Sequence, residues 1–93
     1  MLVGVLEMDL YLPSCNSLKE KRYVMKSLKD KMKSRFNISV AETDSQDLWQ
    51  RSTLVVAVIA TSGSRANSLL SKVVKFVEED RRLQLLDYRL KFL

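Results

Sequence analysis

The sequence predicts an α+β domain in which four strands and two helices follow one another in the order βαββαβ. Two observations favour this class. Two segments with the period of an amphipathic helix separate segments that alternate, or run apolar, with the character of strands. The chain has 93 residues, of which 46% are hydrophobic. A second core would need roughly 50 more residues, so we expect residues 1–93 to form one domain.

The first strand and the first helix have clear boundaries in the sequence. Residues 2–12 alternate with a period of two, which predicts a strand that Pro13 ends. Ser17 and Glu20 have the spacing of a capping box, in which the serine accepts from the third helical amide and the glutamate reaches back to the cap. A helix should therefore begin there and run to about residue 35, on the apolar stripe formed by Leu18, Met25, Leu28 and Met32, with Val24 on its flank.

The remaining elements follow from the same periodicities. Residues 36–43 alternate around Ile38 and Val40 and predict a shorter strand, followed by a polar connection. Residues 53–61 are β-branched without polar alternation, so we expect a central strand shielded on both faces. A hydroxyl cap within residues 61–64 precedes a second amphipathic helix that extends to about residue 80. The last strand should lie within residues 83–92.

This order is the split βαβ arrangement of ferredoxin-like domains. Right-handed crossovers place both helices on one face of a four-stranded antiparallel sheet with the strand order 4-1-3-2. The other face is then bare, and an exposed apolar patch is unusual in a monomer. We therefore expect a homodimer through the open face, with Val3, Val5, Tyr11, Trp49 and Val55 at the interface. The alternative is that long Arg and Lys side chains of an edge strand lean over the valines.

Carboxylates also lie on the open face of the predicted sheet. Glu7 and Asp9 are two residues apart on one strand, a spacing that could hold a metal ion or act as acid and base. The neighbouring antiparallel strand offers Arg89 and Lys91. Cross-strand ion pairs are the simpler interpretation, and we expect no metal site.

The positive charge is concentrated in one segment. Residues 19–35 carry eight Lys and Arg against two acids, a balance of 8 − 2 = +6, whereas the whole chain carries +5. On a helix the spacing of three and four residues gathers five of these cations within roughly 80° of arc and along about 20 Å. We name them the basic row: Lys19, Arg22, Lys26, Lys29 and Lys33. The row can follow several phosphates of RNA, and the alternative is a solvated face that keeps the protein soluble.

Three further residues are candidates for nucleic-acid binding. Lys21 points toward the apolar side of the helix, where it either extends past the sheet end or reaches a ligand. Trp49 could stack on a base with Arg51 beside it, although a tryptophan more often fills the end of a core or a dimer interface. With the basic row, Lys21 and Arg51 complete the predicted nucleic-acid contacts. Tyr11 is nearly alone on the open face, so backbone contacts are favoured over base reading.

Several classes of function are disfavoured by composition. There is no histidine, and the single cysteine cannot form an internal disulfide, which is typical of a cytoplasmic protein. Cys15 precedes a helix but has no histidine to activate it, so we expect an inert thiol, no cofactor and no enzyme. The longest apolar run, residues 54–60, is far shorter than the about 20 residues of a membrane span. The apolar amino terminus lacks a basic region and is interpreted as a strand rather than a signal peptide.

Three blocks of sequence resemble the signature blocks of the YlxP-like family of small bacterial proteins. They are Ser17-Leu18-Lys19-Glu20-Lys21-Arg22, Arg35-Phe36-Asn37-Ile38-Ser39-Val40-Ala41-Glu42 and Asp47-Leu48-Trp49-Gln50-Arg51. The resemblance spans nearly the whole chain and implies a ferredoxin-like fold without an assigned activity. Genes of the family often lie among those for translation initiation and ribosome maturation, which implies a translation-related role by association. Among the motif residues, Lys21, Glu42, Asp47 and Arg51 could form a polar site at one sheet edge.

Where relatives tend to have an acidic residue after the third strand, this chain has hydroxyl and glycine residues at 61–64. A site that relies on a carboxylate there is not expected. The function expected from the sequence is a non-catalytic RNA-associated accessory protein in translation or ribosome maturation. The alternative is a homodimeric module that binds another protein.

Overall fold

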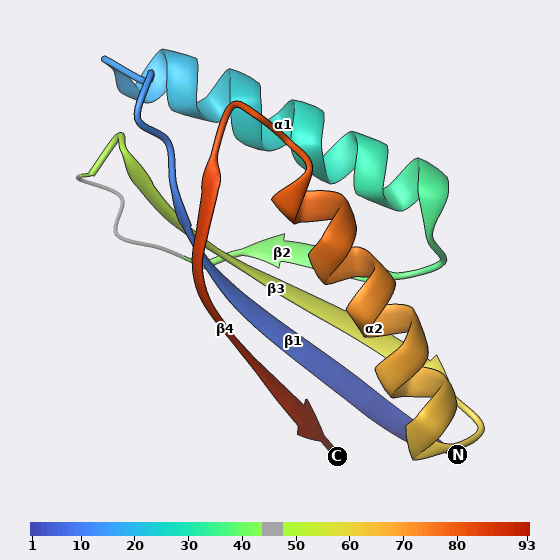
Figure 1. Ribbon diagram of the computed structural model, residues 1–93. Coiled ribbons are helices and arrows are strands. Elements are labelled where there is room, and N and C mark those ends of the chain that lie inside the picture. Colours follow the sequence, from blue (N-terminus) through green and yellow to red (C-terminus); the bar gives the residue numbers. More distant parts are fainter. Residues whose placement is uncertain (44–47) are drawn as a thin grey trace.

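The computed structural model describes residues 1–43 and 48–93 and has the predicted order of elements (Figure 1). A long first strand leads into the longer of the two helices, and a short second strand lies between that helix and the central third strand. The elements are β1 (Leu2–Tyr11), α1 (Leu18–Arg35), β2 (Ser39–Glu42), β3 (Arg51–Ala60), α2 (Gly63–Glu78) and β4 (Gln84–Phe92).

The four strands form one antiparallel sheet in the order β2-β3-β1-β4, which is the predicted order counted from the opposite edge. β1 and β3 are the central pair and are in register from Leu2↔Ala60 to Tyr11↔Arg51. Both helices lie on the same side of the sheet (Figure 1). The α+β ferredoxin-like prediction is therefore confirmed, and the opposite face of the sheet has no helix over it.

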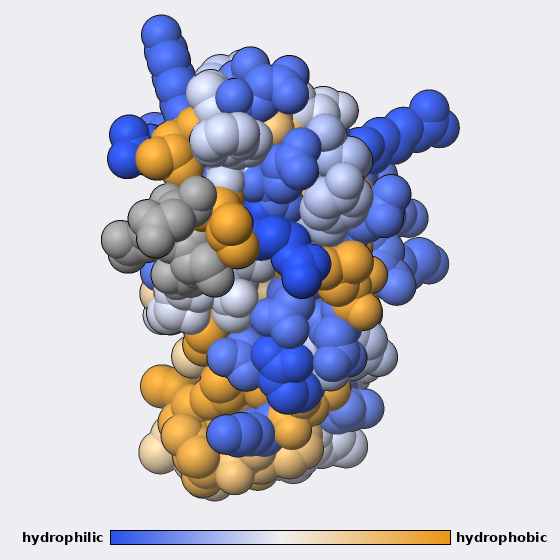
Figure 2. Space-filling model, turned by 90° about the vertical axis from the view of Figure 1, so that its left-hand side faces the viewer, coloured by the Kyte–Doolittle hydropathy of each residue, from blue (hydrophilic) through white to orange (hydrophobic). Residues whose placement is uncertain are grey.

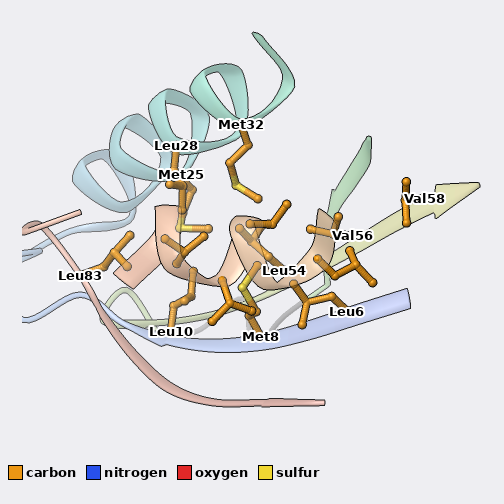
Figure 3. Close-up of a cluster of buried hydrophobic side chains, with 14 of the residues drawn as sticks. Leu6, Met8, Leu10, Met25, Leu28, Met32, Leu54, Val56, Val58 and Leu83 are labelled. Atoms are coloured by element: carbon orange, nitrogen blue, oxygen red, sulfur yellow. The ribbon is translucent and has the colours of Figure 1, made fainter. Parts of the chain in front are cut away.

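The core lies between the sheet and the helices. Alternate residues of β1 and β3 point toward the helices, and they meet the apolar stripe of α1 (Figure 3). Met25, Leu28 and Met32 are fully buried, as the stripe predicts. The same buried cluster contains Leu6, Met8, Leu10, Leu54 and Val56 of the strands, and α2 adds Leu70, Val73 and Val77.

Serine hydroxyls begin both helices, as predicted. Ser17 Oγ accepts from the amide of Glu20 at 3.2 Å, and Ser62 Oγ accepts from the amide of Arg65 at 3.3 Å. The Glu20 carboxylate was expected to accept from the amide of the cap residue Ser17. It accepts instead from the amide of Asn16, one residue earlier, at 3.1 Å. The negative side chain thus still lies at the positive end of the α1 dipole.

Gly4 allows α2 to lie close to β1. A Cβ atom on this residue would be 3.1 Å from Leu70 Cδ1 and 3.2 Å from Ala66 Cβ, both on α2. The close approach explains an isolated glycine inside a strand.

One expectation about β3 is wrong for a single chain. Its helix-facing residues are buried, but on the other face Val55 and Ala57 are only half-buried and Ile59 is 70% exposed. The apolar run correctly indicated a central strand. Two helices, however, cover only one side of the sheet, so the second face has no element over it.

Candidate nucleic-acid interface

The basic row lies on the flank of α1 that faces β2. Lys29 identifies this flank, because its Nζ is 3.4 Å from Glu42 Oε1 at the end of β2. Lys19, Arg22, Lys26 and Lys33 are exposed to solvent along the same helix. The fold therefore presents the row at the surface, about a quarter-turn from the buried stripe.

Ion pairs divide the row into three groups. Lys19, Arg22 and Lys33 form no salt bridge with any described residue. Lys26 Nζ lies 2.9 Å from Asp30 Oδ2 in an exposed pair, which raises the pKa of Lys26 and lowers the pKa of Asp30. Such an exposed pair is screened by salt and exchanges easily for another anion.

Lys29 differs from the other members of the row. It is half-buried, and its partner Glu42 is held in place because Glu42 Oε2 accepts from Ser52 Oγ at 2.9 Å. Moving Lys29 to a phosphate would leave this carboxylate, which is only partly exposed, without its cation. The structure thus reduces the predicted contacts on the row to Lys19, Arg22, Lys26 and Lys33.

Lys21 does not belong to the exposed surface. Its side chain is 3% exposed, and its Nζ donates to the backbone carbonyl of Leu48 at 3.0 Å. This corrects its prediction as a nucleic-acid contact. Its position instead ties the first turn of α1 to the segment that leads into β3.

That segment is a tight turn, which we name the Trp49 turn (residues 48–51). The amide of Arg51 donates to Leu48 O at 3.5 Å, and Gln50 O accepts from the amide of Leu12 at 2.8 Å. Gln50 Nε2 also donates to Pro13 O and Cys15 O, at 3.4 and 3.3 Å. The turn is therefore held against the end of β1 and the start of α1.

Trp49 is 45% exposed, so it does not fill the end of the core within one chain, and its predicted place in a dimer interface stays a prediction. It occupies a central position of the turn, from which a side chain projects outward. Beside it lies an open pocket of about 410 Å³, lined by Tyr11, Leu48, Trp49, Gln50 and Arg51. Of these lining residues, Arg51 supplies the positive charge.

The polar site suggested by the motif residues does not form as one cluster among the described residues. Asp47 lies outside the described residues. Glu42 is bound by Lys29 and Ser52 on the helix side of the sheet. Arg51 precedes the buried Ser52 in β3 and is exposed, so alternation along the strand directs it to the opposite face.

The open face combines an ion-pair cluster with an apolar region. Arg89 Nε donates to Glu7 Oε1 at 2.9 Å and its NH1 group donates to Asp9 Oδ2 at 3.2 Å, which confirms the predicted cross-strand pairs for Arg89. Lys91 forms no ion pair with the rest of the described chain. Arg89 and Lys91 line a small pocket of about 100 Å³ with Val5 and Val55, so these long side chains partly cover the valines.

The predicted dimer residues fall at two ends of this face. Val3 and Val5 lie at the start of β1 near the exposed Ile59, whereas Tyr11 ends β1 next to the Trp49 turn. Figure 2 shows apolar side chains gathered at the lower end of the molecule, where the termini lie in Figure 1. Ile59 was not among the predicted residues, although its alternation with Val55 and Ala57 places it on the same face.

Cys15 has the environment of an unreactive thiol. It is buried, and this burial is the main cause that raises its pKa, with a smaller contribution from the charge of Glu20. The thiol is therefore protonated at neutral pH, as the sequence predicted. It contributes to the wall of a pocket of about 530 Å³ beside the first turns of α1, which Lys19 and Arg81 also line.

Asp80 and Arg82 fix the connection between α2 and β4. Asp80 Oδ2 accepts from the Arg82 NH2 group at 2.8 Å, and Arg82 also donates to Ser27 Oγ of α1 at 3.1 Å. The hydrogen bond from Arg82 lowers the pKa of Asp80 despite its partial burial. Because the folded state holds this carboxylate ionised, protonation of Asp80 must weaken the fold.

We expect the free energy of unfolding to fall as the pH drops below about 4, the usual pKa of an unfolded aspartate. The sign follows from the depressed pKa of Asp80, whose contribution is complete above that value and is lost as the pH falls through its folded pKa. Asp80→Asn should lower stability at pH 7 and reduce the acid dependence, as measured by urea unfolding between pH 7 and pH 2.5. An unchanged acid dependence in Asp80→Asn would show that Asp80 is not a linked carboxylate.

Two further properties of the described residues concern metal sites and membrane spans. No group of three or more Cys, Asp or Glu side chains there is arranged to hold a metal ion. No helix of that part of the chain is both long and apolar enough to cross a bilayer.

The fold and the surface define a small ferredoxin-like α+β protein with an exposed basic first helix. The chain belongs to the family described as "Protein of unknown function (DUF503)", which matches residues 3–90. It is 31% identical over 77 residues to the "Uncharacterized protein YlxP" of Bacillus subtilis (strain 168), covering 83% of this chain and 84% of that protein. The resemblance to the YlxP-like family is therefore confirmed.

One solved structure supports the fold. The de novo designed protein LFR1 1 with ferredoxin fold is 18% identical and superposes with a TM-score of 0.51, covering 100% of this chain and 84% of its own. Another designed protein, Ferredog-Diesel, is 8% identical with a TM-score of 0.48, covering 96% of this chain and 83% of its own. At such identities a likeness concerns architecture and not function.

Proposed function

We propose that this protein is a non-catalytic, cytoplasmic RNA-binding accessory protein, acting in translation or ribosome maturation, that docks RNA phosphates on the basic row of α1. One observation carries the proposal. Lys19, Arg22 and Lys33 lie exposed on one flank of a single helix, without salt bridges to the described residues, and Lys26 joins them through an exchangeable pair. Like charges three and four residues apart do not stabilise a helix, so local stability does not explain the row.

The arrangement favours contacts to the RNA backbone. Four cations over about 20 Å of helix can follow one line of phosphates. Near the ion-pair cluster, the open face carries charged and β-branched strand residues. This part of the face therefore has no row of aromatic rings on which bases could stack. Structured RNA, with its regular phosphate rows, is the ligand class that fits.

The test is a titration of a fluorescently labelled RNA hairpin with the protein at several salt concentrations, followed by anisotropy. With four phosphate contacts, the logarithm of the association constant should fall against the logarithm of salt concentration with a slope of about −3. Affinity should drop about 60-fold between 50 and 200 mM salt. Binding that does not respond to salt, or no binding at 50 mM salt, would contradict the proposal.

A second candidate function is a homodimeric module, and the exposure of Ile59 favours it. Ile59, Val3 and Val5 lie at the apolar end of the open face, and a second copy presenting the same end would bury it. Light scattering on the samples used for the RNA titration gives the mass directly. A monomer at micromolar concentration would reject this candidate and leave the RNA proposal unaffected.

A further inference from the structure

Phosphate contacts along α1 give no role to the pocket beside Trp49. Its walls combine an indole, a phenol, an amide and a guanidinium group from Trp49, Tyr11, Gln50 and Arg51. Its volume of about 410 Å³ lies within the roughly 300–1,000 Å³ of typical ligand sites. The exposed Trp49 lies on a turn that hydrogen bonds through four backbone carbonyls tie to the end of β1 and the start of α1.

We infer that this pocket binds one unpaired nucleotide of the RNA, with its base stacked on Trp49 and its phosphate near Arg51. The inference rests on the proposed function and names the form of RNA that the protein takes, a helix with an adjoining single-stranded nucleotide. Aromatic rings accept any base, because every base has a π-face, and a guanidinium group beside the ring supplies the charge that phosphate requires.

Gln50 adds a polar contact for the base. Its Nε2 is engaged by the carbonyls of Pro13 and Cys15. Its Oε1 accepts no hydrogen bond from the described residues, and no described buried polar atom lacks a partner, so this oxygen is open to solvent. It is available to accept from an amino or imino group of a base, a contact that an apolar peptide side chain could not use.

The pocket is also connected to the basic row. Lys21 lies in the first turn of α1, between Lys19 and Arg22, and it donates to Leu48 O in the wall of the pocket. Lys21 is thus a positioning residue, which holds the stacking surface next to the amino-terminal end of the row. Lys21 therefore links the amino-terminal end of the row to the pocket, in which Arg51 supplies the positive charge.

The first experiment uses the fluorescence of Trp49, which is the only tryptophan in the chain. Nucleoside monophosphates, and an RNA hairpin with a single-stranded tail, should quench this fluorescence saturably, because stacking on the indole requires a base. Ribose 5-phosphate, which has the phosphate but no base, should leave the fluorescence unchanged.

The second experiment measures affinity by anisotropy. Trp49→Ala should weaken binding of the tailed hairpin by about 5- to 150-fold, the effect of losing one stacked base, and leave a blunt RNA duplex unaffected. Trp49→Phe should restore most of the difference. Tyr88→Ala is the matched control, since Tyr88 is an aromatic residue with the same 45% exposure on β4, and it should not change either affinity.

The outcomes separate the two proposals. If the tailed hairpin binds with the expected salt dependence but neither quenches Trp49 nor responds to Trp49→Ala, the nucleotide pocket is wrong and the RNA function stands. The exposed tryptophan would then belong to a protein interface. If no RNA binds at low salt, both proposals are wrong.

Discussion

Simultaneous replacement of Lys19, Arg22, Lys26 and Lys33 by Glu should abolish RNA binding. Each replacement removes a phosphate contact and adds a repulsive charge, so we expect the association constant to fall by at least about 100-fold at 100 mM salt. Lys29 is left unchanged because it pairs with Glu42, and its reversal would place two carboxylates together. Anisotropy with the labelled hairpin measures the effect, and circular dichroism checks that the helix is retained.

The control must separate the row from the net charge. Four reversals change the charge from +5 by −8, to −3. Reversal of four exposed cations away from the row gives the same total: Arg65, Lys72, Lys75 and Lys91. This control should retain most of the affinity. Equal losses in both variants would mean that the proteins respond to overall charge, and the basic row would not be a binding site.

Leu28→Ala in α1 should produce a large loss of stability. Leu28 is fully buried between the helix and the sheet, and a buried leucine truncated to alanine costs about 2–5 kcal/mol. A domain of this size unfolds with a free energy of about 5–15 kcal/mol. We therefore expect the midpoint of thermal unfolding to fall by roughly 10–30 °C.

Tyr23→Ala provides the comparison on the same helix. Tyr23 is 74% exposed, so its truncation removes more atoms but should change stability by no more than about 0.5 kcal/mol. At a temperature where the Leu28→Ala variant is still folded, this variant should bind RNA with the affinity of the wild-type protein, because the basic row lies on another side of α1. Similar losses in the two variants would mean that α1 is not packed on the sheet by this stripe.

The architecture was predictable because it depends on local patterns. The stripe at Met25, Leu28 and Met32 repeats with the period of a helix, and the stripe is what the sheet buries. Ser17 and Ser62 begin helices because a hydroxyl satisfies amides only three residues away. Handedness of the crossovers then leaves few arrangements for four strands and two helices.

The site was predicted less completely, and the errors share one cause. Lys21 and Lys29 belong to the same helix as the exposed cations, but their partners are Leu48 and Glu42, which are 27 and 13 residues away. Trp49 was expected at the end of a core or at a dimer interface, and its exposure within one chain depends on a turn that is held by contacts to residues 12–15. The spacing of residues along one helix or strand does not reveal contacts with residues far away in the sequence.

The sequence alone determined the order of the elements, the topology of the sheet, and the presence of a cationic flank on the first helix. These properties follow from side-chain periodicity and from chain handedness, which act within or between neighbouring segments. Only the tertiary structure decided which cations are accessible and that Trp49 faces solvent. Burial and charge pairing depend on which distant residues the fold brings within a few ångströms, and packing of the whole domain fixes those distances.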